Sequence, residues 1–138
     1  MQDGLADNTI SSIYKDKDGF MWFGTNNGLS RYDGKSIRNF SFSQTYMNVT
    51  EIFEISEGYL GVIAGGALYC FRKRTESFVP AVCINDSNRL YTLHVLPADD
   101  RTFWALSGRK LCLYTHEEIK NEKGEILFIS LKCKREFD

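Results

Sequence analysis

Two tight turns within residues 8–33 constrain the fold more than any other feature of the sequence. Asp16–Gly19 and Asn26–Gly28 separate three short runs of apolar, β-branched and aromatic residues. Asp-Gly and Asn-Gly steps between such runs are the strongest local signal for β-hairpins. A further step, Asp33-Gly34, leads into the alternating run SIRNFSF. The stretch therefore predicts four antiparallel strands in about 40 residues, the size of one propeller blade.

The same pattern returns twice with less of its detail. A shift of 39 residues aligns Trp22 with Gly61, and a further shift of 43 aligns Gly61 with Trp104. Leu29 has its equivalent in Leu68 by the first of these shifts. Periods of 39 and 43 residues fit four-stranded repeats and not helical repeats of about 34 residues.

The repeats predict an all-β fold: a β-propeller fragment of about three four-stranded antiparallel blades. We expect the blades at about 4–42, 46–83 and 88–133 of a partial propeller that spans 1–138. A propeller typically needs four to eight blades, so three leave open sheet edges at both ends. The chain is therefore expected to be a fragment, a truncated product or half of an assembly that a partner closes.

The later copies carry three local expectations. The fourth strand of the second copy is expected at 77–79, where Pro80 ends it. In the third copy a polar insert at 115–125 precedes a fourth strand at 126–129. Residues 116–122 are expected to make one helical turn at most.

Composition limits the function. The hydrophobic share of 43% is enough for a packed core, and the net charge of −1 gives no basic field for nucleic acid. No window approaches the roughly 18–20 apolar residues that span a bilayer. The first residues lack the pattern of a signal peptide, so either the protein is cytosolic or a targeting segment was removed.

Metal, cofactor and enzyme sites are not expected. The cysteines have no CxxC spacing and no neighbouring histidine, and disulfides are permitted but not required; they are Cys70, Cys83, Cys112 and Cys133. Asp16-Lys17-Asp18-Gly19 resembles the opening of a calcium loop but lacks the later ligands. His94 and His116 accompany no nucleophile motif, and the carboxylate pairs Asp99-Asp100 and Glu117-Glu118 are typical of solvated loops.

One motif within the first copy identifies a family. Its residues are Asp16, Gly19, Met21, Trp22, Phe23, Gly24, Thr25, Gly28, Leu29, Arg31, Tyr32 and Asp33. This run resembles the two-component regulator propeller repeat. The resemblance implies a non-catalytic periplasmic sensor segment of a bacterial hybrid two-component histidine kinase, an inner-membrane protein. It also implies a response to glycan-derived oligosaccharides, signalling to transcription and a kinase outside this chain.

The partners that the resemblance implies are the remaining blades and sensor domains of the parent protein and an oligosaccharide ligand. A homodimer through open sheet edges is a further possibility, and nucleic acid is not expected. The alternative hypothesis is a protein–protein interaction module, or a truncated protein, that assembles through those edges. The later copies depart from the motif, so no ligand specificity can be transferred.

The signature residues are interpreted as framework, and the ligand-binding residues are unknown. These structural residues are Asp16, Gly19, Trp22, Gly24, Thr25, Gly28, Leu29, Tyr32 and Asp33. Trp22 and Trp104 are either sugar-stacking platforms or packing between blades, and their place in the second strand favours packing. Gly24 and Gly28 are expected to permit close strand approach and a left-handed turn.

Overall fold

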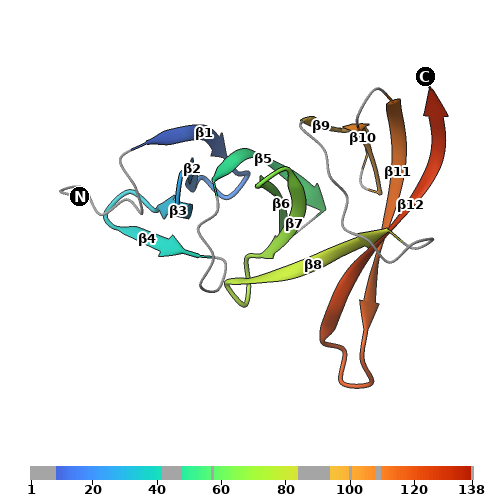
Figure 1. Cartoon of the computed structure of the whole chain (residues 1–138). Helices are drawn as coiled ribbons and strands as arrows, with labels where there is room; N and C mark the ends of the chain where they lie inside the picture. Colours follow the sequence, from blue (N-terminus) through green and yellow to red (C-terminus); the bar gives the residue numbers. More distant parts are fainter. Residues whose placement is uncertain are drawn as a thin grey trace.

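The described part of the chain is built from two β-sheets. The computed structural model describes residues 9–41, 48–56, 58–83, 94–99, 101–107 and 110–137. These residues form twelve strands, arranged as one four-stranded and one eight-stranded sheet (Figure 1). The expected all-β class is confirmed.

The first repeat forms a four-stranded sheet by itself. Its strands are β1 (Ile10–Lys15), β2 (Met21–Thr25), β3 (Gly28–Tyr32) and β4 (Ile37–Phe40). They lie in the order β1-β2-β3-β4, and each pair is antiparallel. Gly19 in the first turn has φ of +93°, a left-handed conformation that favours glycine. The antiparallel four-stranded unit expected from the turn residues is confirmed.

The second repeat supplies half of the larger sheet. Its strands are β5 (Val49–Ser56), β6 (Tyr59–Ala64), β7 (Ala67–Arg72) and β8 (Ser77–Cys83). Consecutive strands pair antiparallel, as in the first repeat.

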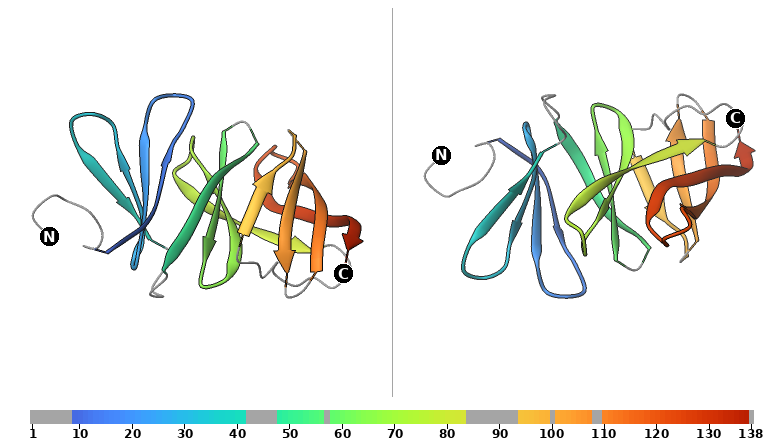
Figure 2. Two further views of the ribbon diagram at one scale, coloured as in Figure 1. Left: turned by 90° about the horizontal axis from the view of Figure 1, so that it is seen from above. Right: turned by 90° about the horizontal axis from the view of Figure 1, so that it is seen from below.

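The third repeat supplies the other half. Its strands are β9 (His94–Pro97), β10 (Thr102–Ser107), β11 (Lys110–Lys120) and β12 (Ile126–Phe137). They too pair antiparallel in sequence order. Figure 2 shows the three repeats in a row, in blue, green and orange to red.

The second and third repeats are joined in one mixed sheet, so the structure does not show three separate blades. The strand order is β5-β6-β7-β8-β12-β11-β10-β9. The junction is a parallel pairing in which Ala81 lies opposite Ile129 and the next two residues of each strand continue the register. The two edge strands approach each other, since the Val95 N–H donates to Glu51 Oε1 at 3.2 Å. The eight strands therefore form a nearly closed, barrel-like sheet.

The expectation that Pro80 ends its strand is wrong. β8 continues through Pro80 to Cys83. Pro80 lies opposite Tyr69 of β7, whereas pairing with β12 begins only at Ala81. At Pro80 the strand is still an edge, where a residue without an N–H is tolerated.

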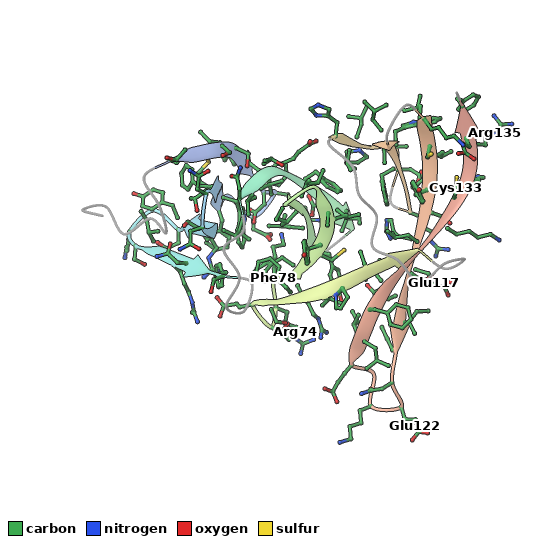
Figure 3. The ribbon with its side chains drawn as sticks, in the orientation of Figure 1. Arg74, Phe78, Glu117, Glu122, Cys133 and Arg135 are labelled. Atoms are coloured by element: carbon green, nitrogen blue, oxygen red, sulfur yellow. The ribbon has the colours of Figure 1, made fainter. Side chains whose placement is uncertain are left out.

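The expectation of a polar insert at 115–125 is wrong, because strand β11 occupies most of it, and residues 116–122 form no helical turn. β11 runs on to Lys120, and β12 begins at Ile126 and continues far beyond the expected end at residue 129. The two strands form a long hairpin that extends away from the body, with Glu122 at its tip (Figure 3). Both faces of the β11 half, residues 115–120, carry polar residues, so the alternation that marks a half-buried strand is absent there.

The core has two layers that lie on either side of β5–β7. Alternate residues of a strand point to opposite faces, and all six residues of β6 are buried. One face packs against the first sheet through Trp22, Leu29, Phe40, Val49, Ile52, Leu60, Val62, Ala64 and Phe71. The other face lines the barrel-like interior, where residues such as Ile63 and Leu68 meet Phe103 and Leu131.

Gly61 belongs to the interior face, and the Phe53 ring lies directly over it. A Cβ at Gly61 would stand 2.2 Å from Phe53 Cζ, which is closer than real contacts allow. Phe53 and Gly61 are directly opposite in the β5–β6 pair. In the first repeat the equivalent positions hold Tyr14 and Trp22, so the second repeat keeps the ring of the first strand and lacks the indole of the second.

Candidate functional site

Trp22 lies at the centre of the contact between the two sheets. Its side chain is fully buried, and its ring centroid is 6.0 Å from that of Phe40 and 5.5 Å from that of Phe71. Phe71 belongs to β7, so this aromatic cluster joins the first repeat to the second. A buried ring offers no face for a sugar to stack on.

Asp16 is a buried carboxylate that accepts hydrogen bonds from three donors. Its Oδ1 accepts from the backbone N–H groups of Asp18 at 2.9 Å and Phe20 at 3.0 Å. Its Oδ2 accepts from Nε1 of Trp22 at 2.8 Å and lies 3.5 Å from Nζ of Lys73. Burial raises the pKa of Asp16, but the hydrogen bonds and the Lys73 charge outweigh it and hold the pKa below its usual value. The Asp16 carboxylate therefore connects the β1–β2 turn, the Trp22 indole and Lys73 of the second repeat.

Four further signature residues pack close to the second repeat or within the turn after β2. A Cβ on Gly24 would lie 2.6 Å from Val49 Cγ1, so only glycine permits this approach to β5. Gly28 has φ of +105°. The buried hydroxyl of Thr25 donates to the Gly28 carbonyl at 3.0 Å, and Leu29 is fully buried. These residues shape the backbone and the core.

The remaining signature residues lie at the surface. Asp33 accepts hydrogen bonds from the N–H groups of Lys35 and Ser36, and these lower its pKa. Tyr32 donates to the Gly34 carbonyl at 3.0 Å. Both side chains stabilise the turn between β3 and β4.

Arg31 lies above the aromatic cluster and connects it to charged residues of the second repeat. Its guanidinium carbon is 5.4 Å from the ring centroid of Phe20, within the range of a cation–π contact. One terminal nitrogen is 3.2 Å from Glu76, and Arg38 reaches the other oxygen of Glu76 at 3.2 Å. Glu76 has φ of +54° in the β7–β8 turn, an unusual conformation for a residue with a side chain.

Lys73 and Glu76 are the two contact residues that the sequence reasoning missed. Both lie in the turn Lys73–Glu76, four residues that carry three charges and no glycine. Charged turns are usually solvated, so nothing in the local pattern distinguishes these side chains. An available signal was Asp16 itself, because a carboxylate that becomes buried requires a cation or several donors.

Trp104 has a different environment from Trp22. It occupies the equivalent position in the third repeat, where it is opposite Leu96 and Leu113. Its side chain is only partly buried, and its ring centroid lies 6.2 Å from that of Phe137.

The surface around Trp104 is largely apolar, although Arg135 lies opposite Leu113 in the same row. We call it the Trp104 face; its residues are Leu96, Trp104, Leu106, Leu111, Leu113 and Phe137. Leu96 is 66% exposed, Leu111 42% and Phe137 46%. The corresponding face of the first repeat is the one that β5–β7 cover.

The two histidines lie where the barrel-like sheet nearly closes. His94 Nδ1 is 3.4 Å from Glu51 Oε2, and its side chain is largely exposed. His116 stacks on Phe103 with a centroid distance of 6.2 Å. Burial lowers the pKa of His116 even though its ring N–H donates to the Ile55 carbonyl. Its Nε2 is buried and finds no hydrogen-bond partner among the described residues.

The described residues contain no group of three or more histidine, cysteine, aspartate or glutamate side chains suited to a metal ion. Asp99 accepts hydrogen bonds from the N–H groups of Arg101 and Thr102, which lower its pKa; Asp100 lies outside the described residues. Glu117 is exposed on the hairpin arm, and Glu118 pairs with Lys120 at 3.4 Å. In the described ranges, no helix is long and apolar enough to cross a membrane.

Comparison with known families identifies one repeat. Residues 4–27 match the family model described as "Two component regulator propeller". The match covers β1 and β2, whereas the Gly28–Asp33 part of the motif lies beyond it. No curated protein matches the chain. The chain therefore contains a two-component regulator propeller repeat, within the sheet that Trp22 and Asp16 join to the second repeat.

Proposed function

We propose, from the propeller repeat at residues 4–27, that this chain is a non-catalytic sensor segment of a hybrid two-component histidine kinase. In this proposal the segment lies in the periplasm as part of an inner-membrane protein, and each of the three repeats serves as a blade. The parent protein responds to glycan-derived oligosaccharides and signals to transcription, while its kinase lies outside this chain.

The repeat match carries the proposal, and the Trp104 face supports its further blades. The directly opposed residues of this face correspond to those of the first repeat. Leu96, Trp104 and Leu113 occupy the positions of Tyr14, Trp22 and Arg31. In the first repeat this face is covered by the next three strands. Contiguous exposed apolar surface is typical of an interaction site. A further blade packed on the Trp104 face would bury it in the same way.

The opposite end of the row also supports further blades. Ile10 and Ile13 on β1 and Tyr32 on β3 are exposed, with Ile13 at 63%. Both ends of the three-repeat row therefore carry large exposed hydrophobic side chains, while the two internal contacts are packed. That distribution favours an internal segment of a longer stack.

Signalling in such a sensor is a population shift. A ligand changes the kinase only if it binds one arrangement of the sensor more tightly than another. The oligosaccharide class rests on the family resemblance alone. The signature residues are engaged in packing and turns, so the ligand contacts are expected from other parts of the assembled propeller.

The test uses the parent ectodomain that contains this segment. Thermal unfolding is followed with a panel of glycan-derived oligosaccharides, and a ligand at about 100 times its Kd adds about 2.7 kcal/mol to the stability. A rise in Tm with one sugar class and not with the others supports the proposal. It fails if no sugar shifts Tm, or if the gene encodes neither a membrane helix nor a kinase downstream.

A protein–protein interaction module is the second candidate, and the same exposed surfaces favour it. Among the residues that the structure describes, β12 pairs beyond Leu131 only with β11, which leaves one edge of residues 132–137 available for strand addition there. Light scattering after size exclusion distinguishes the candidates. A defined oligomer that Leu106→Lys on the Trp104 face disrupts, and Glu122→Lys at the hairpin tip does not, supports the interaction module. A strict monomer contradicts it.

A further inference from the structure

Two cysteines from different strands lie together at the open end of the third repeat. Cys112 is on β11, and its side chain is 4% exposed. Cys133 is on β12, opposite Tyr114, and is exposed. Both are thiols in the structure. Figure 3 shows Cys133 on the half of β12 that lies away from the hairpin tip at Glu122.

The pairing register directs both thiols to one face. Directly opposed residues of an antiparallel pair share a face, so Cys133 lies on the face of Tyr114. Cys112, two residues from Tyr114, points to the same face. The register shifts between Leu113 and Tyr114, so Lys134 is the extra residue of a β-bulge beside Cys133.

The Cys133 side chain leans toward Cys112. Its Sγ donates to the Arg135 carbonyl at 3.4 Å, toward the C-terminal end of β12. Cys112 is opposite Glu136 in that direction. The Cys133 side chain is close enough to contribute to the raised pKa of Cys112. The two sulfurs are therefore already neighbours, without a change of register.

We propose that Cys112 and Cys133 form a cross-strand disulfide by exchange with a low-molecular-weight disulfide such as oxidised glutathione. The inference does not rest on the proposed sensor function. It assigns a redox modification site to the β11–β12 pair.

The exposure of the two thiols sets the order of the exchange. Cys133 is accessible, so its thiolate attacks one sulfur of the small disulfide, forms a mixed disulfide and releases one small thiol. The thiolate of Cys112 then attacks the Cys133 sulfur, and the second small thiol leaves. One small disulfide is reduced to two thiols as two protein thiols are oxidised. Burial, with the neighbouring Cys133 and Glu136, raises the pKa of Cys112, so less of it is thiolate at neutral pH and the second step is the slower one.

The bond would hold the end of β12 onto β11. Residues 132–137 have no pairing with β8, since that pairing ends at Leu131. Phe137, in this segment, contributes its ring to the Trp104 face. Oxidation would thus fix one part of that apolar surface, and reduction would release it.

The test is peptide mapping of the full chain. Protein incubated with oxidised glutathione is alkylated and digested with trypsin without reduction. The masses of the peptides are then measured by mass spectrometry. Trypsin separates residues 111–120, with Cys112, from residues 133–134, with Cys133. The expected product is these two peptides joined with the loss of two hydrogens. Closing a loop of this length is also expected to raise Tm by about 10 °C over the reduced protein.

Two variants complete the test. Cys133→Ser, at an exposed position, should remove both the linked peptide and the redox dependence of Tm. Cys83→Ser keeps both candidate thiols and should retain both effects. The proposal is overturned if Cys133 remains as a glutathione adduct, pairs with Cys83 or forms a disulfide with a second chain. In each of these outcomes Cys112 is still a thiol and is alkylated only after unfolding.

Discussion

Trp22 and Trp104 occupy the same position in two repeats, yet one is buried between sheets and the other faces solvent in part. The difference arises from their neighbours. Trp22 is covered by β5–β7 and donates to a buried carboxylate, whereas Trp104 contacts Phe137 on an apolar face that the described residues leave exposed. The same residue in the same register is therefore core in one place and surface in another, according to which layer lies against it.

The largest difference in stability is expected when each indole is removed. Trp22→Ala should lower the free energy of unfolding by about 3–5 kcal/mol, through a cavity and the loss of a donor to buried Asp16. Trp104→Ala in the same chain should cost about 1 kcal/mol or less, because its surroundings are already solvated. Urea unfolding measures both, and equal losses would contradict the contrast.

The buried carboxylate gives the next largest effect. Asp16→Asn should cost about 1.5–3 kcal/mol at neutral pH, because hydrogen bonds to a charged group are lost. The pKa of Asp16 is lower in the folded protein than in the unfolded chain. The stabilisation that ionised Asp16 gives the folded protein is therefore present above the unfolded pKa of about 3.9. It is lost as the pH falls through the folded pKa.

The difference in stability between the native protein and Asp16→Asn should accordingly shrink below about pH 4. Urea titrations at several pH values measure it. Glu122→Gln, at the exposed tip of the hairpin arm, is the control. If the difference stays constant down to low pH, the charge of Asp16 does not contribute to stability.

Close approach at Gly24 can be tested against its equivalent in the third repeat, Leu106. Gly24→Ala should cost about 1–3 kcal/mol, because the new Cβ meets Val49 and Ser12. Leu106 occupies the position of Gly24 in the third repeat, on an exposed face. Leu106→Ala should therefore change stability by less than about 1 kcal/mol. Thermal unfolding of the pair measures the contrast, and a tolerated Gly24→Ala would show that β5 can shift.

The smallest effect is expected at the charged residues above the cluster. Glu76→Gln removes the partner of Arg31 and Arg38 and should cost about 0.5–1 kcal/mol, since the pair is partly exposed. The loss should decrease at high salt. Urea unfolding at low and high salt checks this, and a salt-independent loss would point to the turn backbone instead.

The sequence predicted what depends on short-range pattern. Turn residues such as Gly19 located the hairpins of the first repeat, and the spacing of Trp22, Gly61 and Trp104 aligned the three repeats. It did not predict the parallel pairing of Ala81 with Ile129, because partners so distant along the chain leave no local periodicity.

The environment of the site residues was likewise only partly predictable. Asp16 was interpreted as a turn former, and its role as a buried acceptor for Trp22 became visible only in the folded chain. The extension of β11 through residues 116–120 was missed because its sequence is polar on both faces, whereas the apolar run at 126–129 indicated its partner strand.

The Phe53 ring lies over Gly61, at the position that Trp22 occupies in the first repeat, and this bears on how such repeats are detected. Two positions on adjacent strands share one volume, and either strand can fill it. A profile that scores each position alone records the glycine as a loss, although the packing is intact. Counting repeats by their tryptophans therefore undercounts them, and the pair of opposed positions is the better unit of comparison.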